Sequence, residues 1–449
     1  MLNQATAIRP AATAGTVPAG ATTSVAHARD LKWDLLLFCV AGYLLTSVGR
    51  VHQLFPVLAL FRPALLTGLL AIAIYLADPQ LVRRANLLWN STTKYLVALL
   101  VWMILSVPGA LVRGTSFELV FDSFVKTVLM YMVVAGAVRG PRDVERLVVV
   151  YLIAATVYAA VVITRFDLGG GDNWRLGHLY YYDANDFATF AVTAMPFGLY
   201  FLHAGRALVA RMLAAGSLAI LTLAFVNSGS RGGFVALVAV TAFIVVRYNA
   251  IALRWRVAAT ALVTVVILGA ASERYWTQMS TILSDADYNR TDESGRLQIW
   301  SRGIGYMFQN PILGVGPHNF QAAEGRLSAF SDRQQLGVGV RWNAPHNTYL
   351  QAGAELGFPG LAIFLLLIGS AFAALGRTSR WERALIRAGE DRPQLAPALT
   401  ASLIGFVVGA FFLSLAYSEI LFTLVALAVG LQKVTVPAGP RVAQRGVRR

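Results

Sequence analysis

Cysteine occurs only once in this chain of 449 residues, at Cys39. A single thiol forms no intramolecular disulfide, so a disulfide-stabilised scaffold is excluded and the redox compartment stays open. Charged residues are also scarce, at 14%, against about 25% in soluble domains. Hydrophobic residues reach 57%. This balance predicts a membrane protein rather than a soluble or disordered one.

Several motifs of soluble enzymes are missing as well. The sequence contains no Gly-Lys-Ser/Thr, so it gives no P-loop and no sign of ATP use. It also contains no His-Glu-x-x-His and no Cys/His cluster. Asp285 and Asp287 form an isolated Asp-x-Asp, which can hold a metal that bridges a diphosphate. Such pairs are common in solvated loops, so we expect neither a metal site nor a cofactor.

Long apolar segments are abundant. A tail at 1–30, rich in Ala, Thr, Gly and Pro, precedes them without the apolar run of a signal peptide. Most of the segments approach the ~20 residues that cross a bilayer. The sequence predicts an all-α polytopic membrane protein with about twelve transmembrane helices, at 33–49, 56–77, 94–112, 118–138, 145–164, 187–203, 208–226, 233–247, 255–272, 356–375, 396–415 and 418–433.

The net charge of +15 supports this count. On a soluble protein it would suggest nucleic acid, but here Lys and Arg gather in alternate loops. If the N-terminus is cytoplasmic, every cytoplasmic loop is cation-rich, as the positive-inside rule requires. We therefore expect a multi-pass membrane protein with both termini in the cytoplasm and no nucleic-acid partner. Arginine far outnumbers lysine, which suits phosphate binding or reflects an arginine-rich genome.

One outside loop is much longer than the others. It has seven arginines and seven acidic residues over 273–345, and loops of this length usually carry function or are disordered. Leu297, Trp300, Ile304, Met307 and Phe308 share one helical face, with Ser294 as the expected N-cap and Pro311 ending the pattern. Such an amphipathic helix could lie on the membrane surface. The expected organisation is a flexible cytoplasmic tail (1–30), transmembrane helices 1–9 (31–272), a large periplasmic loop (273–345), transmembrane helices 10–12 (346–435) and a basic cytoplasmic tail (436–449).

Two cations fall inside predicted spans. Lys126 lies about eight residues, or ~12 Å, into its span, and Arg62 lies at similar depth below the same face. A charge at that depth is costly unless it is paired or hydrated. Asp122, one turn earlier, is a possible partner for Lys126. The alternatives are a structural ion pair with a snorkelling arginine, or a cationic pocket for an anionic lipid headgroup.

Ser228-Gly-Ser-Arg231-Gly-Gly joins two predicted spans on the outside. Glycines let the backbone approach a ligand, and the following helix offers free N–H groups and its positive dipole end. Arg231 is therefore a candidate phosphate ligand. Another outside loop contains Arg175 and the run Tyr180-Tyr-Tyr-Asp183-Ala-Asn185-Asp186. This run suits sugar binding by Asn185 and Asp186, or an aromatic belt at the interface.

The large loop ends in Asn343-Ala-Pro345-His346-Asn347. A histidine at a membrane–water boundary can be neutral near pH 7 and accept a proton. His346 lies next to Asn347, at the start of a predicted membrane helix and on the same face as Arg231 and Arg296. These neighbours favour a general base over a structural histidine. Glu355 follows nine residues later, inside the apolar zone.

Four motifs occur in order along the chain: Ser228-Gly-Ser-Arg231-Gly-Gly; Gly295-Arg296-x-x-x-Trp300; Asn310-Pro-Ile-Leu-Gly314-Val-Gly316-x-x-x-Phe320; and His346-Asn347-x-x-Leu350-x-x-x-x-Glu355-x-Gly357-x-x-Gly360. Together they resemble the O-antigen ligase/polymerase superfamily of bacterial envelope proteins. The motifs cover roughly 228–360, and the span count with its large outside loop extends the resemblance over most of the chain.

The resemblance implies a GT-C-like fold and a metal-independent, inverting glycosyl transfer at the periplasmic face. It implies a donor glycan on undecaprenyl diphosphate, a base at His346 and diphosphate-binding arginines at Arg231 and Arg296. We expect Arg62, Lys126, Arg175, Asn185, Asp186, Asn347 and Glu355 to contribute to substrate binding.

The superfamily uses three kinds of acceptor: lipid A–core oligosaccharide, a second lipid-linked glycan, and protein Ser/Thr. The short tail after the last span disfavours the protein-glycosylating relatives. The single large loop is more like the ligases, because polymerases often divide their outside mass between two loops. We therefore expect a ligase with lipid A–core as acceptor. A secondary transporter is the rival from another class, but no repeated halves with midplane sites are found. His318 is the rival base.

Overall fold

The computed structural model describes residues 32–79, 87–165, 176, 182–204, 207–284, 295–329, 331–332, 344–390 and 394–437. The predicted tail at 1–30, Arg175, Asp285 and Asp287 lie outside these residues. By its internal contacts the chain divides after Trp33, and the architecture below is that of the unit Asp34–Arg449.

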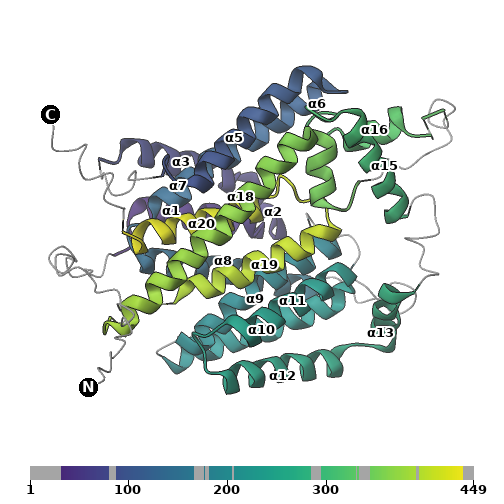
Figure 1. Ribbon diagram of the computed structural model, residues 1–449. Coiled ribbons are helices and arrows are strands. Elements are labelled where there is room, and N and C mark those ends of the chain that lie inside the picture. The colour runs from purple at the N-terminus through teal and green to yellow at the C-terminus, as the bar shows by residue number, and fades with distance from the viewer. Residues whose placement is uncertain are drawn as a thin grey trace, which may run out of the picture. The chain divides into compact units, whose positions relative to one another are not determined.

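Each of the twelve predicted apolar segments contains helix (Figure 1). The segment at 56–77 is divided into two helices, Pro56–Leu60 and Pro63–Ala77, so Arg62 is an N-cap with left-handed φ and not, as predicted, a residue inside a continuous span. The described residues contain helices and connecting turns and no β-strand. The helices in these segments are α1 (Leu35–Tyr43) with its π-helical continuation η2 (Leu44–Val48), α2 (Pro56–Leu60), α3 (Pro63–Ala77), α5 (Ser91–Ser106), α6 (Arg113–Phe117) with η5 (Glu118–Phe124) and α7 (Val125–Ala137), α8 (Pro141–Arg165), α9 (Ala184–Ala204), α10 (Leu208–Ser228), α11 (Arg231–Arg247), α12 (Leu253–Ala270), α18 (Thr348–Arg387), α19 (Leu395–Gly409) and α20 (Glu419–Thr435).

The long helices have the length and composition of membrane spans. Among the described residues, eight helices are long and apolar enough to cross a bilayer, and Leu35–Val48 and Pro63–Ala77 are shorter apolar helices. Helices α11 and α20 have 17 residues each. Large apolar side chains are exposed on the outer surface of the bundle, such as Leu208, Met212 and Leu213 on α10. The protein is therefore a polytopic helical membrane protein.

Helix α9 lies at the centre of the packing. Its aromatic residues Phe187, Phe190 and Phe197 are fully buried, and Tyr151 of α8 contacts Phe190 and Phe197 edge-on. The Ser402 hydroxyl of α19 donates to the Thr193 carbonyl oxygen at 2.7 Å. Residues from three helices thus fill one core, which burial of aromatic area stabilises.

The first and last described helices meet at one end of the bundle. Arg139, after α7, pairs with Asp34 at the start of α1 (3.1 Å) and with Asp143 in α8 (2.8 Å). Lys433, near the end of α20, donates to the carbonyl oxygens of Ala135 and Gly136 (2.9 and 3.1 Å). These contacts place the start of α1 and the end of α20 at the same end of the bundle.

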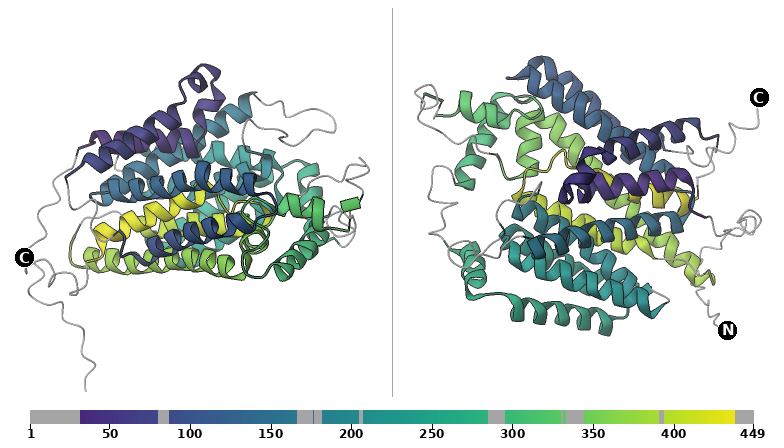
Figure 2. Two further views of the ribbon diagram at one scale, coloured as in Figure 1. Left: turned by 90° about the horizontal axis from the view of Figure 1, so that it is seen from above. Right: turned by 180° about the vertical axis from the view of Figure 1, so that it is seen from behind.

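The opposite end carries the short helices of the large loop: α13 (Glu273–Ser280), α15 (Arg296–Gln309) and α16 (Phe320–Leu327) (Figures 1 and 2). The expected helix near 296–308 is confirmed, but its N-cap is Gly295 rather than Ser294. Buried Glu324 accepts hydrogen bonds from Arg302 (2.6 Å) and the Tyr306 hydroxyl (2.6 Å), which joins α16 to α15. These contacts hold α16 against α15.

Helix α18 is broken near its start, at Gly357. Its φ and ψ of 71° and −176° are essentially accessible to glycine alone. The break frees backbone groups, and each finds a partner: the Phe358 N–H donates to the Pro311 carbonyl (2.9 Å) and the Trp102 indole donates to the Leu356 carbonyl (2.9 Å). The predicted span at 356–375 is therefore the second part of a longer, kinked helix, and Thr348–Leu356 is a separate short helix.

We predict that Gly357→Ala destabilises the protein by about 1–3 kcal/mol, because alanine is strained at this φ and ψ. A Cβ there would also overlap the Ile312 carbonyl oxygen. Gly369→Ala on the same helix is the matched control, since open space surrounds that position. It should change stability by no more than about 1 kcal/mol. Thermal unfolding of both variants in detergent measures this, and equal melting temperatures would contradict the prediction.

Candidate functional site

His346 lies in a tight turn at the loop end of the bundle. Its φ of 44° is left-handed, a rare conformation for a residue with a Cβ. A hydrogen bond holds the turn in place: the His346 N–H donates to the Ser414 hydroxyl at 2.9 Å. Arg50, Arg62 and His318 are the other non-glycine residues with positive φ in the described chain. Such strained positions concentrate at functional sites.

The residues after His346 begin helix α18. Asn347 is the N-cap, and its Oδ1 accepts hydrogen bonds from the N–H groups of Tyr349 and Leu350, both at 3.0 Å. The Thr348 hydroxyl donates to the Leu413 carbonyl oxygen (2.8 Å) and accepts from the Leu415 N–H (2.9 Å). His346 therefore directly precedes a helix whose first turn is hydrogen-bonded to the connection between α19 and α20.

Arg296 is brought to His346 by helix α15. Trp300 donates its indole N–H to the Pro345 carbonyl oxygen (2.9 Å), and its ring contacts Phe411 edge-on. Arg296 precedes Trp300 by four residues, so both lie on one face of the helix. Burial lowers the pKa of His346 below its usual value, and the positive charge of Arg296 lowers it further, whereas Asp183 acts in the opposite direction. The imidazole is thus held in its neutral form.

Arg231 is the first residue of α11, and this helix begins close to the connection between α19 and α20. The turn before it contains Gly229 at φ 57°, and the Ser230 hydroxyl caps the helix by accepting from the Gly233 N–H (3.1 Å). The Arg231 guanidinium donates to the Thr281 hydroxyl at 2.7 Å, close to the end of α13. A Cβ on Gly232 would meet Phe412 at 2.7 Å, so α11 starts in tight contact with the residues that follow α19.

The start of α9 borders the site from a third side. Asp183 caps this helix, and its Oδ1 accepts from the N–H groups of Asn185 (2.7 Å) and Asp186 (2.8 Å). The negative charge of Asp183 acts to raise the pKa of His346. Asn185 and Asp186 occupy the first turn of α9 and are half-buried.

Glu355 is fully buried and contacts only protein groups in the described structure. Its carboxylate accepts from the Tyr417 hydroxyl (2.7 Å), the His318 N–H (2.9 Å) and the Phe320 N–H (3.3 Å). These contacts join α18, the turn at 314–320 and the α19–α20 connection. Binding of substrate by Glu355 stays a prediction, as does that by Asn347, whose Oδ1 caps α18.

Arg62 and Lys126 lie elsewhere on the bundle. Arg62 is the exposed N-cap of α3, and Lys126 is exposed on α7. Within the part of the chain that the structure describes, neither has a hydrogen bond or ion pair with His346, Arg231 or Arg296, and no ion pair joins Lys126 to Asp122. A contribution of Arg62 and Lys126 to a cationic pocket stays a prediction.

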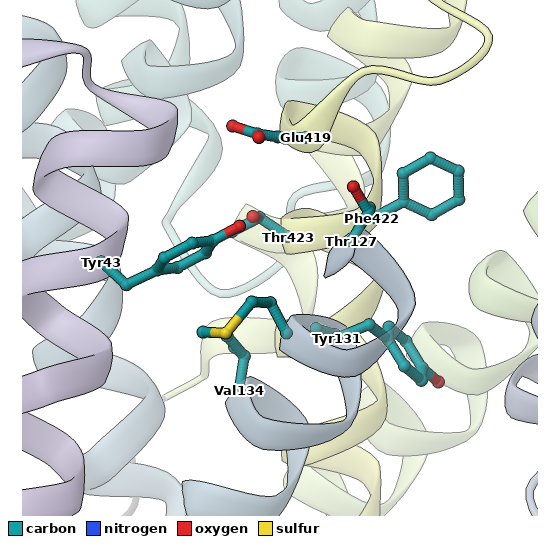
Figure 3. A pocket seen from close by; sticks show the side chains of 9 residues that line it. Tyr43, Thr127, Tyr131, Val134, Glu419, Phe422 and Thr423 are labelled. Carbon is teal, nitrogen blue, oxygen red and sulfur yellow. The ribbon is translucent and has the colours of Figure 1, made fainter. Parts of the chain in front are cut away.

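A small cavity lies beside the start of α20. Figure 3 shows the Glu419 carboxylate at one end and the Tyr43 ring at the side. Glu419 also pairs with Arg50 at 3.3 Å and accepts a hydrogen bond from the Ser47 hydroxyl. The remaining lining mixes hydroxyl-bearing and apolar side chains: Thr127, Met130, Tyr131, Val134, Phe422, Thr423 and Ala426.

Among the described residues, no three His, Cys, Asp or Glu side chains gather as metal ligands would. The Asp285–Asp287 pair lies outside those residues. The groups of the candidate site are the His346 imidazole, the Arg231 and Arg296 guanidinium groups and the capping groups at three helix starts.

The connection between α19 and α20 is the part of this site that sequence reasoning missed. Ser414 holds the His346 N–H, Phe411 packs on Trp300, and Tyr417 bonds to Glu355. In the sequence Phe411 and Ser414 lie within the predicted apolar segment 396–415, and Tyr417 lies in the short interruption before the next one. That interruption marks a turn but does not reveal its partners, which are 60 or more residues away in the chain.

Comparison with known protein families found one match. A family model described as O-antigen ligase matches residues 216–365. The matched segment contains Arg231, Arg296, His346 and Glu355. The chain carries an O-antigen ligase family domain. No match was found among curated proteins.

The O-antigen ligase domain begins within α10 and ends within α18. It therefore includes α13, α15 and α16 of the large loop and the kink at Gly357. The α19–α20 connection follows the domain in the chain but contacts it at two points. Phe411 packs on Trp300, which is hydrogen-bonded to Pro345. Tyr417 donates a hydrogen bond to Glu355, so the connection borders the same candidate site.

We predict that Tyr417→Phe destabilises the O-antigen ligase domain by about 1.5–3 kcal/mol, the range for a hydrogen bond to a charged group. Tyr349→Phe is the matched control, because that hydroxyl donates to a neutral acceptor, the Val407 carbonyl oxygen (2.7 Å). It should cost about 0.5–1.5 kcal/mol. Thermal unfolding in detergent compares the two, and a larger loss for Tyr349→Phe would exclude a central role for the Glu355 contact.

Proposed function

We propose that the protein is an O-antigen ligase, which transfers a glycan from undecaprenyl diphosphate to lipid A–core oligosaccharide. The O-antigen ligase domain supports the reaction class. The observation that carries the proposal is the environment of His346: a buried turn, with a pKa lowered by burial and by Arg296, beside the start of α9. A neutral imidazole next to an arginine suits a base that works beside a diphosphate.

Arg231 and Arg296 bind the donor diphosphate in this proposal. A guanidinium offers a planar pair of donors to phosphate oxygens, and such charge-assisted hydrogen bonds are about twice as strong as neutral ones. Arg62, Lys126 and Arg175 add positive charge for the lipid-linked diphosphate. Asn185, Asp186, Asn347 and Glu355 contribute to the binding of the sugars and to the shape of the site.

The reaction is a single displacement. The acceptor hydroxyl loses its proton to the imidazole of His346, and its oxygen forms a bond to the anomeric carbon of the donor. The bond from that carbon to the diphosphate oxygen breaks on the opposite face, so the configuration inverts. The arginines stabilise the charge that develops on the leaving undecaprenyl diphosphate. General-base catalysis of this kind typically contributes about 10²–10⁴-fold.

The proposed reaction needs neither metal nor cofactor. A diphosphate is a good leaving group, and two arginines supply the charge stabilisation that a divalent metal supplies in other phosphate chemistry. No ATP is required, because the sugar–diphosphate bond is already activated.

The proposal also fixes the topology. Twelve crossings with a GT-C-like arrangement put both termini in the cytoplasm and place α13, α15, α16 and His346 at the periplasmic face of the inner membrane. The cation-rich loops and the common end of α1 and α20 support this orientation.

Transfer by the purified protein in detergent tests the proposal against its rivals. Undecaprenyl-diphosphate glycan is offered with lipid A–core, with a second lipid-linked glycan, or with a Ser/Thr peptide, in each case without ATP. Transfer to lipid A–core supports the ligase. Elongated lipid-linked glycan alone indicates a polymerase, glycosylated peptide indicates a protein O-oligosaccharyltransferase, and no transfer to any acceptor leaves the transporter.

We predict that His346→Ala abolishes transfer but still binds the lipid-linked donor, because the arginines bind the diphosphate. His318→Ala is the matched control: it removes the exposed rival imidazole, and the Glu355 contact of His318 uses its backbone N–H rather than its ring. It should keep substantial activity. Transfer rates and donor binding measure both variants, and reversed phenotypes would assign the base to His318.

We also predict the pH dependence of transfer. The pKa of His346 is lowered in the folded protein, so its neutral form persists below the ordinary value of about 6.5. The kcat/KM for transfer should stay level as the pH falls from 7.5 to 6.5 and decline only at lower pH. A pH–rate profile with a control assay of protein integrity at each pH measures this. An acid limb centred above pH 6.5 would contradict the assignment.

A further inference from the structure

Helix α15 has an apolar face that the rest of the described protein does not cover. Leu297, Ile304 and Phe308 have exposed fractions of 46%, 46% and 66%. Positions 297, 304 and 308 lie within one narrow stripe of a helix with 3.6 residues per turn. Only Ser301, which is also exposed, interrupts this stripe.

The opposite face of α15 is also apolar, and it is the face that packs on the protein. Ile299, Gly303 and Tyr306 are buried, and the Tyr306 ring contacts Phe320 of α16 edge-on. A helix on the surface of a water-soluble domain presents its polar residues outward. In α15 the outward face is apolar instead, which indicates an interaction surface.

The exposed face continues into the membrane-spanning surface of α18. The Phe308 ring contacts Phe358 edge-on, with ring centroids 5.4 Å apart. Phe358 is the first residue after the kink at Gly357, is 41% exposed, and shares a helix face with exposed Leu365, seven residues later. Ile312, in the turn that docks on the kink, is exposed beside them. The apolar surface is therefore unbroken from α15 to a transmembrane segment.

We infer that the outward face of α15 inserts into the lipid leaflet on the His346 side of the membrane. Its occupant is the acyl-chain region just below the headgroups, because the surface is a direct extension of a face that hydrocarbon already covers. Such interfacial helices bury their apolar face about 5–10 Å into the headgroup and acyl boundary. The structure thus describes a membrane-anchored helix within the loop rather than a helix free in water.

The anchor has one consequence that rests on the proposed function. Arg296 is the first residue of α15, and Trp300 ties the same helix to Pro345. A helix held at a fixed depth in the leaflet fixes the height of Arg296 and of the His346 turn above the hydrocarbon. That is the level at which the diphosphate of a membrane-embedded lipid lies.

Depth measurements on the full-length protein test the insertion without any assay of transfer. Cys39 is the only cysteine, so Cys39→Ala gives a background for single-cysteine labelling. Ile304→Cys and Phe308→Cys report on the proposed inserted face. Gln298→Cys is the matched control, because Gln298 is exposed on the same helix but about 100° away around its axis. Each variant carries an environment-sensitive fluorophore in lipid nanodiscs that hold one protein copy.

Spin-labelled lipids with the label near the headgroup should quench positions 304 and 308 at least about twofold more than position 298, given the expected shallow depth. Emission at 304 and 308 should also shift to the blue. Equal quenching at all three positions would overturn the insertion. A blue shift without lipid quenching would also overturn it, since it would show that another part of the protein covers the face. Neither result depends on whether the protein is a ligase.

Discussion

The break in α18 at Gly357 is the constraint on which the site depends. In hydrocarbon an unsatisfied backbone group costs several kcal/mol, so a broken membrane helix needs partners for its freed groups. The turn after α15 supplies them. The N–H groups of Val315 and Gly316 donate to the carbonyl oxygens of Ala354 (2.9 Å) and Glu355 (3.0 Å), and the Pro311 carbonyl accepts from Phe358. The kink therefore requires the loop to dock, and the docked loop brings α15 to His346.

Two of the sequence motifs are explained by this docking. Gly314 has a φ of 68°, and a Cβ there would overlap the Glu355 backbone. The Asn310-to-Gly316 motif and the Glu355-to-Gly360 motif are thus two halves of one contact. The Glu355 side chain adds to this contact, because its carboxylate accepts hydrogen bonds from the His318 and Phe320 N–H groups. In the proposed function these residues shape the site, and the chemistry falls to His346 and the arginines.

The electrostatics at His346 result from the same arrangement. Burial and Arg296 both disfavour the imidazolium, and Asp183 at the start of α9 partly opposes them. Three helix starts and their capping groups (Asp183, Ser230 and Asn347) lie around one turn. Helix N-termini carry partial positive charge, so the site as a whole favours an anion. A neutral base in an anion-binding site is a consistent combination, because Arg296, which binds the anion in the proposed function, also lowers the pKa of His346.

The sequence by itself determined that the chain is helical, because apolar runs of membrane length satisfy their backbone groups as helices: every predicted segment contains helix, and α15 lies where its periodicity placed it. It also predicts which side chains could do chemistry, since Arg231, Arg296 and His346 stand in motifs whose order resembles a known family. Tertiary structure alone decided the contacts between distant segments. No local pattern could show that Ser414 holds the His346 turn, that Glu355 bonds to Tyr417, or that α15 packs through Tyr306 and exposes Phe308. Helical periodicity gives the faces of a helix but not what covers each face, and that depends on which distant segment packs there.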